Sequence, residues 1–360
     1  MADLPTPDFT FDPEAKGACI AGVRPFRTGS YRLDAGTESG KFVVHNYGHG
    51  GAGITLSWGC AAKVRDLVQD HIAGAEDKKA VAVLGSGVMG LTAAMLLSDL
   101  EVTITIYTER AATATTSHKA GGQWAVSVVD FSGKNEEMKE ILRFSYETFK
   151  DSIGKGFGVS ERSNFTATES HNLDVVEQLV PGLLPPRVKH ARLPFEGHTK
   201  SGFEYKTLLI EPPIFLPKLE SELKAKGVTF VTRKFASKSE ILSKLGETII
   251  VNCTGLGAKA LWKDSKMVAI QGQLAMLPPQ AALDYLYGQD GYMFPRTDAV
   301  VIGGTFAEGV GSEVPNKKKC ADLVKHIKSL FGKAKPKPLP AFHIHHPQHS
   351  PTVNPTLPGS

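Results

Sequence analysis

Residues 79–109 constrain the fold of this chain more than any other segment. The apolar stretch VAVL runs into the glycine sequence GSGVMG, which opens an apolar helical stretch, and a second alternating strand ends at Glu109. In such a context Gly85 permits a tight turn, Gly87 lets a pyrophosphate approach the main chain, and Gly90 lets helix and strand pack closely. N–H groups at the helix start then face the phosphates. The pattern predicts half of a doubly wound α/β unit that binds a dinucleotide.

The acidic residue after the second strand supports this interpretation. Glu109 lies 19 residues beyond Gly90, near the separation at which a carboxylate bonds an adenosine ribose. The motif alone does not separate FAD from NAD.

A second glycine-dense stretch, HNYGHGGAG, precedes a predicted helix at 53–72. Glycines remove side chains where a flat ring lies against the main chain. The helix start at Ile54 and Thr55 suits partial negative charge on a bound group, which a reduced flavin carries at one edge. The alternative is a glycine-rich loop that serves only a tight strand-to-helix turn.

Composition excludes several classes of protein. The 360 residues suffice for about two domains, and no run reaches the roughly 18 apolar residues of a membrane span. The N-terminus lacks the basic and apolar regions of a secretory signal. The four cysteines form no CxxC pair, so we expect a cytoplasmic protein without a zinc site. The 41 basic and 37 acidic residues are not segregated, so we expect no nucleic-acid partner and no membrane partner. Four histidines in the Pro- and His-rich tail have no carboxylate between them, so we predict no metal there either: His343, His345, His346 and His349.

Read together, the motifs resemble the D-amino-acid oxidase family of FAD-dependent oxidases, which includes D-aspartate oxidase and is related to glycine oxidase. The matching segments include VAVLGSGVMGLTAAMLL, IIVNCTGLGAKAL, YMFPRTDAVVIGGTF, GVRPFRTGSYRL and VVHNYGHGGAGITLSWGC. In the family, the GVRPFR and HNYGHGG segments come last, after the GGTF strand, whereas here they precede GSGVMG. The resemblance therefore implies a circular permutation, with the family's last helix joined to its first strand through AGAEDKK.

The implied fold class is α/β, with an FAD-binding Rossmann-like domain and a mixed, largely antiparallel β-sheet substrate domain. We expect the FAD-binding domain to comprise residues 20–135 and 227–262. The substrate or cap domain would comprise residues 138–226 and 263–332, and the tail residues 333–360.

The resemblance also implies which residues hold FAD. Those on the ADP half, pyrophosphate and flavin are Gly85, Gly87, Val88, Met89, Gly90, Glu109, Arg110, Thr115, Thr116, Ser117, Gly121, Gly122, Gln123 and Phe235. Those at the pyrimidine edge of the flavin are Gly50, Gly51, Gly53, Ile54 and Thr55.

Four further residues match the family's substrate end. Arg24 aligns with the arginine that grips the substrate carboxylate, a role that suits the fixed charge and parallel donors of a guanidinium. Tyr292 aligns with a tyrosine whose hydroxyl reaches the same carboxylate, and Tyr287 with a lid-side tyrosine, although it lies five residues before Tyr292 rather than four. The main-chain carbonyl of Gly51 would accept from the substrate amine. The alternatives are a surface arginine and core tyrosines.

These residues predict an FAD-dependent oxidase that converts a D-amino acid to the imino acid, and then to the 2-oxo acid and ammonia, while oxygen becomes hydrogen peroxide. The partners are a small amino-acid substrate and oxygen, and a homodimer is one assembly left open. Two alternatives stand: an NAD-linked dehydrogenase of a small carboxylate, and a flavin-binding protein without turnover.

Overall fold

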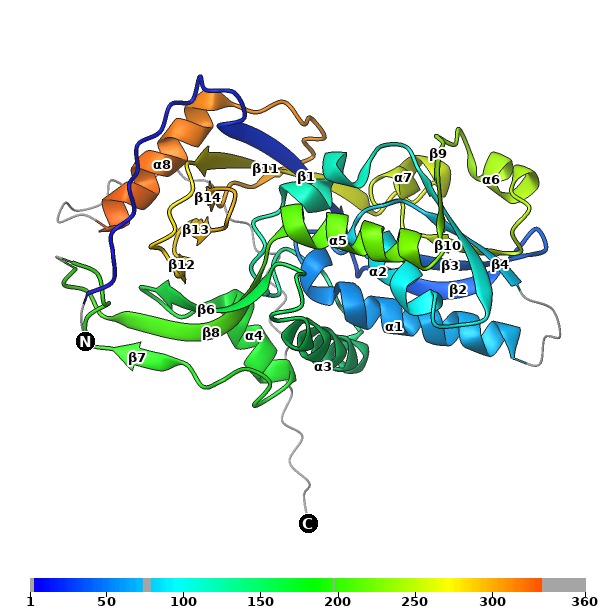
Figure 1. Cartoon of the computed structure of the whole chain (residues 1–360), viewed down its shortest axis with the longest axis horizontal. Coiled ribbons are helices and arrows are strands. Elements are labelled where there is room, and N and C mark those ends of the chain that lie inside the picture. Colours follow the sequence, from blue (N-terminus) through cyan, green and yellow to red (C-terminus); the bar gives the residue numbers. More distant parts are fainter. Residues whose placement is uncertain (1–2, 74–78, 197, 332–360) are drawn as a thin grey trace, which may run out of the picture.

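The computed structural model describes residues 3–73, 79–196 and 198–331, which form two β-sheets with α-helices packed around them (Figure 1). The predicted linker AGAEDKK falls largely, and the tail at 333–360 wholly, outside these described residues. The α/β fold class predicted from the sequence is confirmed.

The smaller sheet has six strands in the order β2-β3-β10-β4-β5-β9. Its core is parallel, and only β2 runs antiparallel, against β3. The strands are β2 (Arg32–Glu38), β3 (Lys41–Tyr47), β10 (Ile249–Asn252), β4 (Lys79–Leu84), β5 (Val102–Thr108) and β9 (Thr229–Thr232).

The apolar runs in these strands form a sheet because both of its faces are buried, as is typical of parallel sheets. Side chains alternate between two hydrophobic clusters. Val81, Val83 and Val251 enter one cluster, whereas Ala82 and Ile250 enter the other. The sheet is therefore the middle layer of three.

Helices cover both faces. On one face α1 (Gly53–Ile72), α2 (Val88–Leu97), α3 (Asn135–Asp151) and α5 (Pro212–Ala225) pack together. There the rings of Trp58, Phe149 and Phe215 meet at 5.3–6.4 Å. On the other face lie α6 (Lys238–Lys244) and α7 (Gly257–Leu261). The predicted helix 53–72 is confirmed.

The larger sheet has nine strands in the order β1-β11-β14-β13-β12-β6-β8-β7, with β15 paired to β11. It is antiparallel except where β12 runs parallel to β6. Helix α8 (Lys317–Phe331) packs on β11 and β14, and α4 (His171–Leu179) packs against α3. The strands are β1 (Cys19–Arg27), β11 (Met267–Leu277), β14 (Val300–Gly303), β13 (Tyr292–Pro295), β12 (Tyr285–Tyr287), β6 (Val159–Thr166), β8 (Gly202–Ile210), β7 (Val188–His190) and β15 (Ala307–Glu308).

Three elements lie elsewhere than the domain division expected from the sequence. Strand β1 was assigned to the FAD-binding domain but pairs along its whole length with β11 in the larger sheet. Helices α3 and α5 were assigned mainly to the cap, but they pack with α1 and α2 in the core of the smaller sheet. An apolar helix face packs against an apolar surface that other elements leave uncovered, and this choice does not depend on the order of the elements along the chain.

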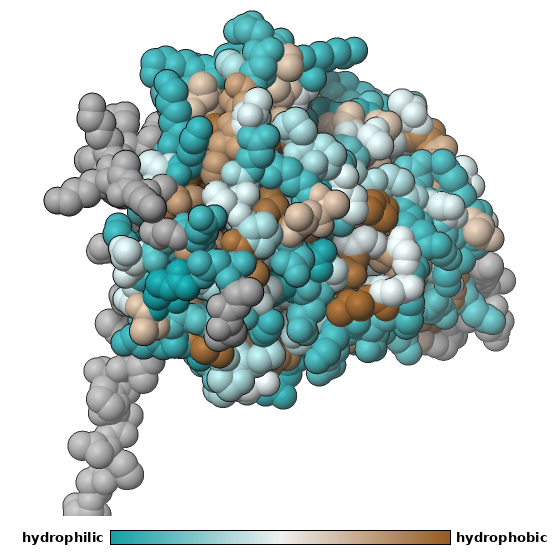
Figure 2. All heavy atoms as spheres, turned by 60° about the vertical axis from the view of Figure 1, so that its left-hand side comes forward, coloured by the Kyte–Doolittle hydropathy of each residue, from teal (hydrophilic) through white to brown (hydrophobic). Residues whose placement is uncertain are grey.

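The face shown in Figure 2 is largely hydrophilic, with apolar residues in small separate groups. Within the described part of the chain, no helix combines the length and apolar character needed to cross a membrane.

Candidate active site

The turn between β4 and α2 has the geometry that its glycines predict. Gly85 has φ +105°, and a Cβ there would lie 2.6 Å from the carbonyl oxygen of Cys253. A Cβ on Gly90 would lie 2.0 Å from the carbonyl oxygen of Gly85. Both distances are far below van der Waals contact, so the first glycine is fixed by the turn and the third by close packing of helix on strand.

The second glycine stretch lies beside the first. A Cβ on Gly53, the first residue of α1, would be 3.8 Å from Val88 Cγ1 and 4.0 Å from Met89 Sδ. Helices α1 and α2 therefore begin side by side. Neither has an acidic residue in its first turn or a side-chain N-cap, so their N-terminal N–H groups favour negative charge on a bound group.

Two glycines of this stretch are also required by the packing of a neighbouring loop. A Cβ on Gly50 would lie 1.9 Å from the carbonyl oxygen of Val128, and one on Gly51 would lie 2.8 Å from that of Ser127. Gly51 N–H also donates to Val128 at 3.0 Å. The space that these glycines leave is occupied by the main chain of 127–128, so the glycines lock this loop to α1.

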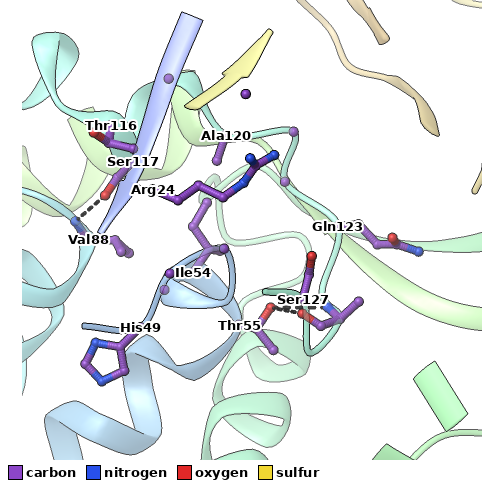
Figure 3. Close-up of a pocket in the computed structure, with 18 of the residues that line it drawn as sticks. Arg24, His49, Ile54, Thr55, Val88, Thr116, Ser117, Ala120, Gln123 and Ser127 are labelled. Carbon is purple, nitrogen blue, oxygen red and sulfur yellow. Dashed lines mark hydrogen bonds between the residues drawn. The ribbon is translucent and has the colours of Figure 1, made fainter. Parts of the chain in front are cut away.

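A pocket opens where the two helix starts meet the larger sheet (Figure 3). Its wall comes from β1, the loop between β3 and α1, the start of α2, the segment 116–127, and β6, β11 and β13. Thr55 holds this wall together, because its hydroxyl donates to the Ala125 carbonyl at 2.9 Å and accepts from the Ala125 N–H at 3.2 Å.

Several predicted flavin residues meet in this pocket. Its lining includes Gly50, Gly51, Gly53, Ile54, Thr55, Val88, Met89, Thr116, Ser117, Gly121, Gly122 and Gln123. The Ser117 hydroxyl accepts from the Val88 N–H at 3.0 Å, which ties segment 116–119 to the start of α2. The Gln123 side chain points away from Arg24.

The predicted ADP-binding residues lie outside this pocket, at the carboxyl edge of the parallel strands. Glu109 follows β5 and pairs with Lys234 at 2.6 Å, and Phe235 follows β9 and packs on Tyr107 at 5.7 Å. The Arg110 guanidinium donates to Glu313 at 3.1 Å. Thr115 caps a short 3-10 turn by donating to Ala112 at 2.6 Å. This edge is where open α/β sheets bind ligands.

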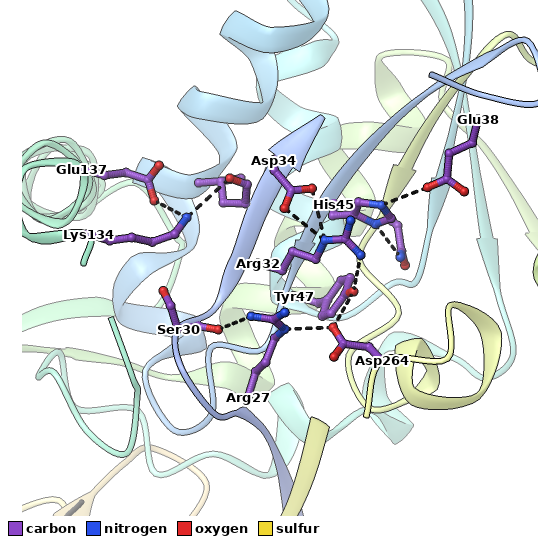
Figure 4. A network of polar contacts seen from close by, with 12 residues as sticks. Arg27, Ser30, Arg32, Asp34, Glu38, His45, Tyr47, Lys134, Glu137 and Asp264 are labelled. Carbon is purple, nitrogen blue, oxygen red and sulfur yellow. Dashed lines mark hydrogen bonds and ion pairs between the residues drawn. The ribbon is translucent and has the colours of Figure 1, made fainter. Parts of the chain in front are cut away.

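Arg24 reaches into the pocket from β1. Its guanidinium donates to the Thr305 carbonyl at 3.3 Å, and no carboxylate of the described residues lies within ion-pair distance of it. The neighbouring arginines differ. Arg27 pairs with Asp264 at 2.8 Å and Arg32 with Asp34 at 3.0 Å, within the network shown in Figure 4. Arg24 is therefore a cation available to a ligand.

Tyr292 lies next to Arg24 in the same pocket and stacks on Phe294 at 4.3 Å. Burial raises the pKa of Tyr292, against the opposing charges of Arg24 and Arg296. Its hydroxyl therefore stays protonated at neutral pH and can donate a hydrogen bond to a carboxylate.

The structure does not bring Tyr287 to the pocket. Side chains alternate along a strand, and β12 directs Tyr287 toward α8, where its ring packs on Phe331 at 4.8 Å and on Phe195 at 6.0 Å. The opposite face of the sheet carries Leu286, which packs near Phe294. The expected lid-side role of Tyr287 is therefore wrong for this geometry.

Sequence reasoning missed several polar residues of the pocket, among them Asn46, Lys119 and Asn164. Asn46 lies within the recognised HNYGHGG segment. Asn164 carried only a glycosylation sequon as a signal, and its exposed fraction of 1% excludes that modification. Lys119 pairs with Glu313 at 2.8 Å.

Buried polar atoms at the pocket fit a polar ring such as a flavin. Asn46 is fully buried, and neither its amide nitrogen nor its amide oxygen has a hydrogen-bond partner of normal geometry in the described structure. The amide lies close to Cys253, where it opposes the large rise that burial causes in the pKa of that thiol. His49 Nδ1 is likewise buried without a partner. Such groups are expensive unless a ligand satisfies them.

This fold and site define a flavin-dependent redox protein. The family model of FAD dependent oxidoreductases (DAO) matches residues 80–349, so the chain belongs to this family. FAD is its cofactor.

Individual relatives and solved structures are also similar to this chain. A D-amino-acid oxidase of Streptomyces coelicolor is 26% identical over 256 residues, covering 69% of this chain and 77% of the relative. A human D-aspartate oxidase is 25% identical over 264 residues, covering 71% and 76%. Among solved structures, glycine oxidase from Bacillus cereus has a TM-score of 0.51 at 13% identity, covering 70% and 78%. L-alpha-glycerophosphate oxidase from Mycoplasma pneumoniae with FAD bound has 0.51 at 15%, covering 71% and 78%.

Proposed function

We propose that this protein is an FAD-dependent D-amino-acid oxidase, which oxidises a D-amino acid to the imino acid while oxygen is reduced to hydrogen peroxide. The observation that carries the proposal is the Arg24 guanidinium, which has no carboxylate partner in the described structure and lies beside the Tyr292 hydroxyl in a pocket that two open helix N-termini border. The similarity to D-amino-acid and D-aspartate oxidases supports it.

Each of these groups has a task in that reaction. Arg24 binds the substrate carboxylate through two parallel hydrogen bonds, and Tyr292 donates a third. The Gly51 carbonyl, which accepts no backbone hydrogen bond from the described residues, accepts from the substrate amine and fixes which face of Cα is presented. When bound beside these residues, FAD would supply the two-electron redox chemistry, with oxygen as the final acceptor. The protein thus contributes orientation rather than a general base.

For the cofactor, we propose that Gly87, Gly90, Arg110, Thr115, Thr116 and Ser117 surround the pyrophosphate. Glu109 and Phe235 would hold the adenosine half. Gly50, Gly51, Gly53, Ile54 and Thr55, with Gly121, Gly122 and Gln123, would border the flavin. Lys234 must release Glu109 before that carboxylate can bond a ribose, and this exposed ion pair is weak enough to exchange.

One experiment tests the activity against both alternatives. Purified protein should absorb near 450 nm, which a nicotinamide enzyme does not. Peroxide release should then be measured with D-amino acids, their L enantiomers, glycine and N-methyl amino acids. Turnover of D-amino acids alone supports the proposal. A flavin spectrum without turnover of any of these amino acids would instead support the alternative of a flavin-binding protein without catalytic activity.

We also propose that the chain is a circular permutation of the family fold. Residues 19–72 supply β1 to one sheet, β3 to the other and α1 to the helical layer, whereas the family match begins only at residue 80. The rings of Phe9 and Phe331 lie 5.7 Å apart, so the end of α8 is adjacent to the segment that leads into β1. The family's order could close there.

A rearranged chain tests this. Residues 79–331 followed by a short Gly/Ser linker and residues 9–73 should fold, bind FAD and retain the visible spectrum. A rearranged chain that stays insoluble or colourless would contradict the proposal. The homodimer and the cytosolic location stay predictions.

A further inference from the structure

The charges of the pocket restrict which substrate side chain it can accept. Its described lining contains two cations, Arg24 and Lys119, and no aspartate or glutamate. Arg24 has the substrate carboxylate to bind, and Lys119 is paired with Glu313 at 2.8 Å. A second carboxylate on the substrate would have to compete with Glu313 for Lys119, and a cationic side chain finds no carboxylate among the described lining residues. Burial of an unpaired charge is strongly unfavourable.

Besides Asn46 and His49, the described lining holds a third neutral residue with an unpartnered polar atom. Asn164 lies in β6 and is 1% exposed, and its amide oxygen is buried with no hydrogen-bond partner in the described structure. The residue lines the pocket. An acceptor left in this state is costly until a donor meets it.

The sheet places Asn164 on the same wall as Tyr292. Asn164 is paired in register with Leu286 of β12, and Leu286 packs with Phe294 and Tyr292. The turn from β12 to β13 adds space in front of the amide, because Gly288 has no side chain and a Cβ there would lie 3.2 Å from Asn164 Oδ1. Gly288 stands four residues before Tyr292, where the resemblance implied a tyrosine.

We propose that Asn164 is a specificity-determining residue, whose amide oxygen accepts a hydrogen bond from a neutral substrate side chain carrying a hydroxyl or amide group. This inference rests on the proposed function, since it names the substrate class for the same site. The preferred substrates are therefore small D-amino acids with a donor on the side chain, rather than acidic, basic or purely apolar ones.

Isosteric pairs of substrates test the inference in the FAD-loaded protein. D-asparagine should have a higher kcat/KM than D-leucine and D-aspartate, and D-serine a higher kcat/KM than D-2-aminobutyrate. The difference should be about 10-fold or more for at least one of these comparisons, namely the one in which the side-chain donor reaches the Asn164 amide oxygen. D-lysine should be poor. Binding measured through the change in the flavin spectrum should follow the same order.

Two variants separate recognition from folding. Asn164→Leu keeps the side-chain shape. It should reduce the ratio of kcat/KM between the polar and the apolar substrate of each pair to about one, while the rate with D-alanine stays within about threefold of the parent protein. Ser163→Ala is the matched control, because the Ser163 hydroxyl bonds Glu204 instead, and its ratios should equal those of the parent protein.

The outcomes are distinct. If no amino acid is oxidised, the proposed function fails. If D-amino acids are oxidised but the parent protein shows no preference within the isosteric pairs, or Asn164→Leu retains it, the inference is overturned and the proposed function stands. If Asn164→Leu does not fold, the test rests on the preference of the parent protein within the pairs and on Asn164→Asp. A carboxylate at this position should raise kcat/KM for D-lysine relative to D-asparagine, and no such rise would overturn the inference.

Discussion

Val88 lies beside Gly53, because a Cβ on Gly53 would stand only 3.8 Å from Val88 Cγ1. They belong to the two glycine motifs, which enter the fold from different strands of the smaller sheet. Because this contact joins the two helix starts, both motifs open on one pocket. A single cofactor can therefore contact both.

Gly90 should tolerate no side chain. In Gly90→Ala the new methyl group would stand 2.0 Å from the Gly85 carbonyl oxygen, which forces α2 away from β4. We expect a loss of at least about 2 kcal/mol in the free energy of unfolding, together with loss of the absorbance near 450 nm. Gly246→Ala is the control, because no atom of the described residues lies within 4 Å of a Cβ there. A similar loss in both variants would contradict the packing argument.

Arg24→Ala should weaken substrate binding without releasing the cofactor. Loss of a charged bidentate contact is worth about 2–4 kcal/mol, so kcat/KM for amino acids should fall about 30- to 1000-fold, mostly through KM. Arg24→Lys should recover part of it, since a point charge replaces the fork. Steady-state kinetics with a flavin titration checks this, and an unchanged KM would remove Arg24 from the site.

Asp264 should anchor the N-terminal segment. Its carboxylate accepts from Arg27 at 2.8 Å and from the Tyr47 hydroxyl at 2.9 Å (Figure 4), and it is largely buried. Asp264→Ala leaves Arg27 without its carboxylate partner and should lower the free energy of unfolding by about 2–4 kcal/mol in urea titrations. The control Asp34→Ala removes an exposed partner of Arg32, and it should change the free energy of unfolding by no more than about 0.5 kcal/mol.

His49 should make the protein sensitive to acid. Burial, with a smaller effect from Lys134, lowers the pKa of His49 to about 3, while the ring stacks on Tyr31 at 5.0 Å and contacts Cys60. The unfolded chain takes up this proton near pH 6.5 and the folded protein does not. Stability is therefore complete above pH 6.5 and falls by about 1.4 kcal/mol per pH unit as the pH drops toward 3.

Unfolding of His49→Gln should show a shallower decline below pH 6.5, measured by urea titration at several pH values. Between pH 7 and 8 the two curves should run parallel. An unchanged slope in the variant would show that His49 is not the group responsible. His45, whose pKa burial lowers to about 4, adds a decline of its own in both proteins.

The sequence predicted those parts that local chemistry determines. The strand–glycine–helix unit and the helix 53–72 follow from apolar periodicity and from glycine positions, and Arg24 followed from its motif. The destinations of β1, α3 and α5 depend on which apolar face is left uncovered by distant segments, and no local pattern carries that information.

The site shows the same division. Tyr287 and Tyr292 have similar surroundings in the sequence, but strand alternation and the turn between them send the two rings to opposite faces of the sheet. Gly50 and Gly51 line the pocket where the flavin contact was predicted, but their close approach to the main chain at 127–128 was not predicted. Asn164 carried no sequence signal of a binding role, because its proposed role lies in a hydrogen bond that the described part of the fold leaves unmade.

The order of the strands has a consequence for synthesis on the ribosome. Strand β3 ends at Tyr47, but its parallel neighbour β10 begins only at Ile249, about 200 residues later. At about 5–20 residues per second the first strands wait roughly 10–40 s for their neighbours. Throughout that interval their unpaired edges are exposed to other nascent chains, so the yield of this protein in cells should depend on chaperones that shield its earliest residues.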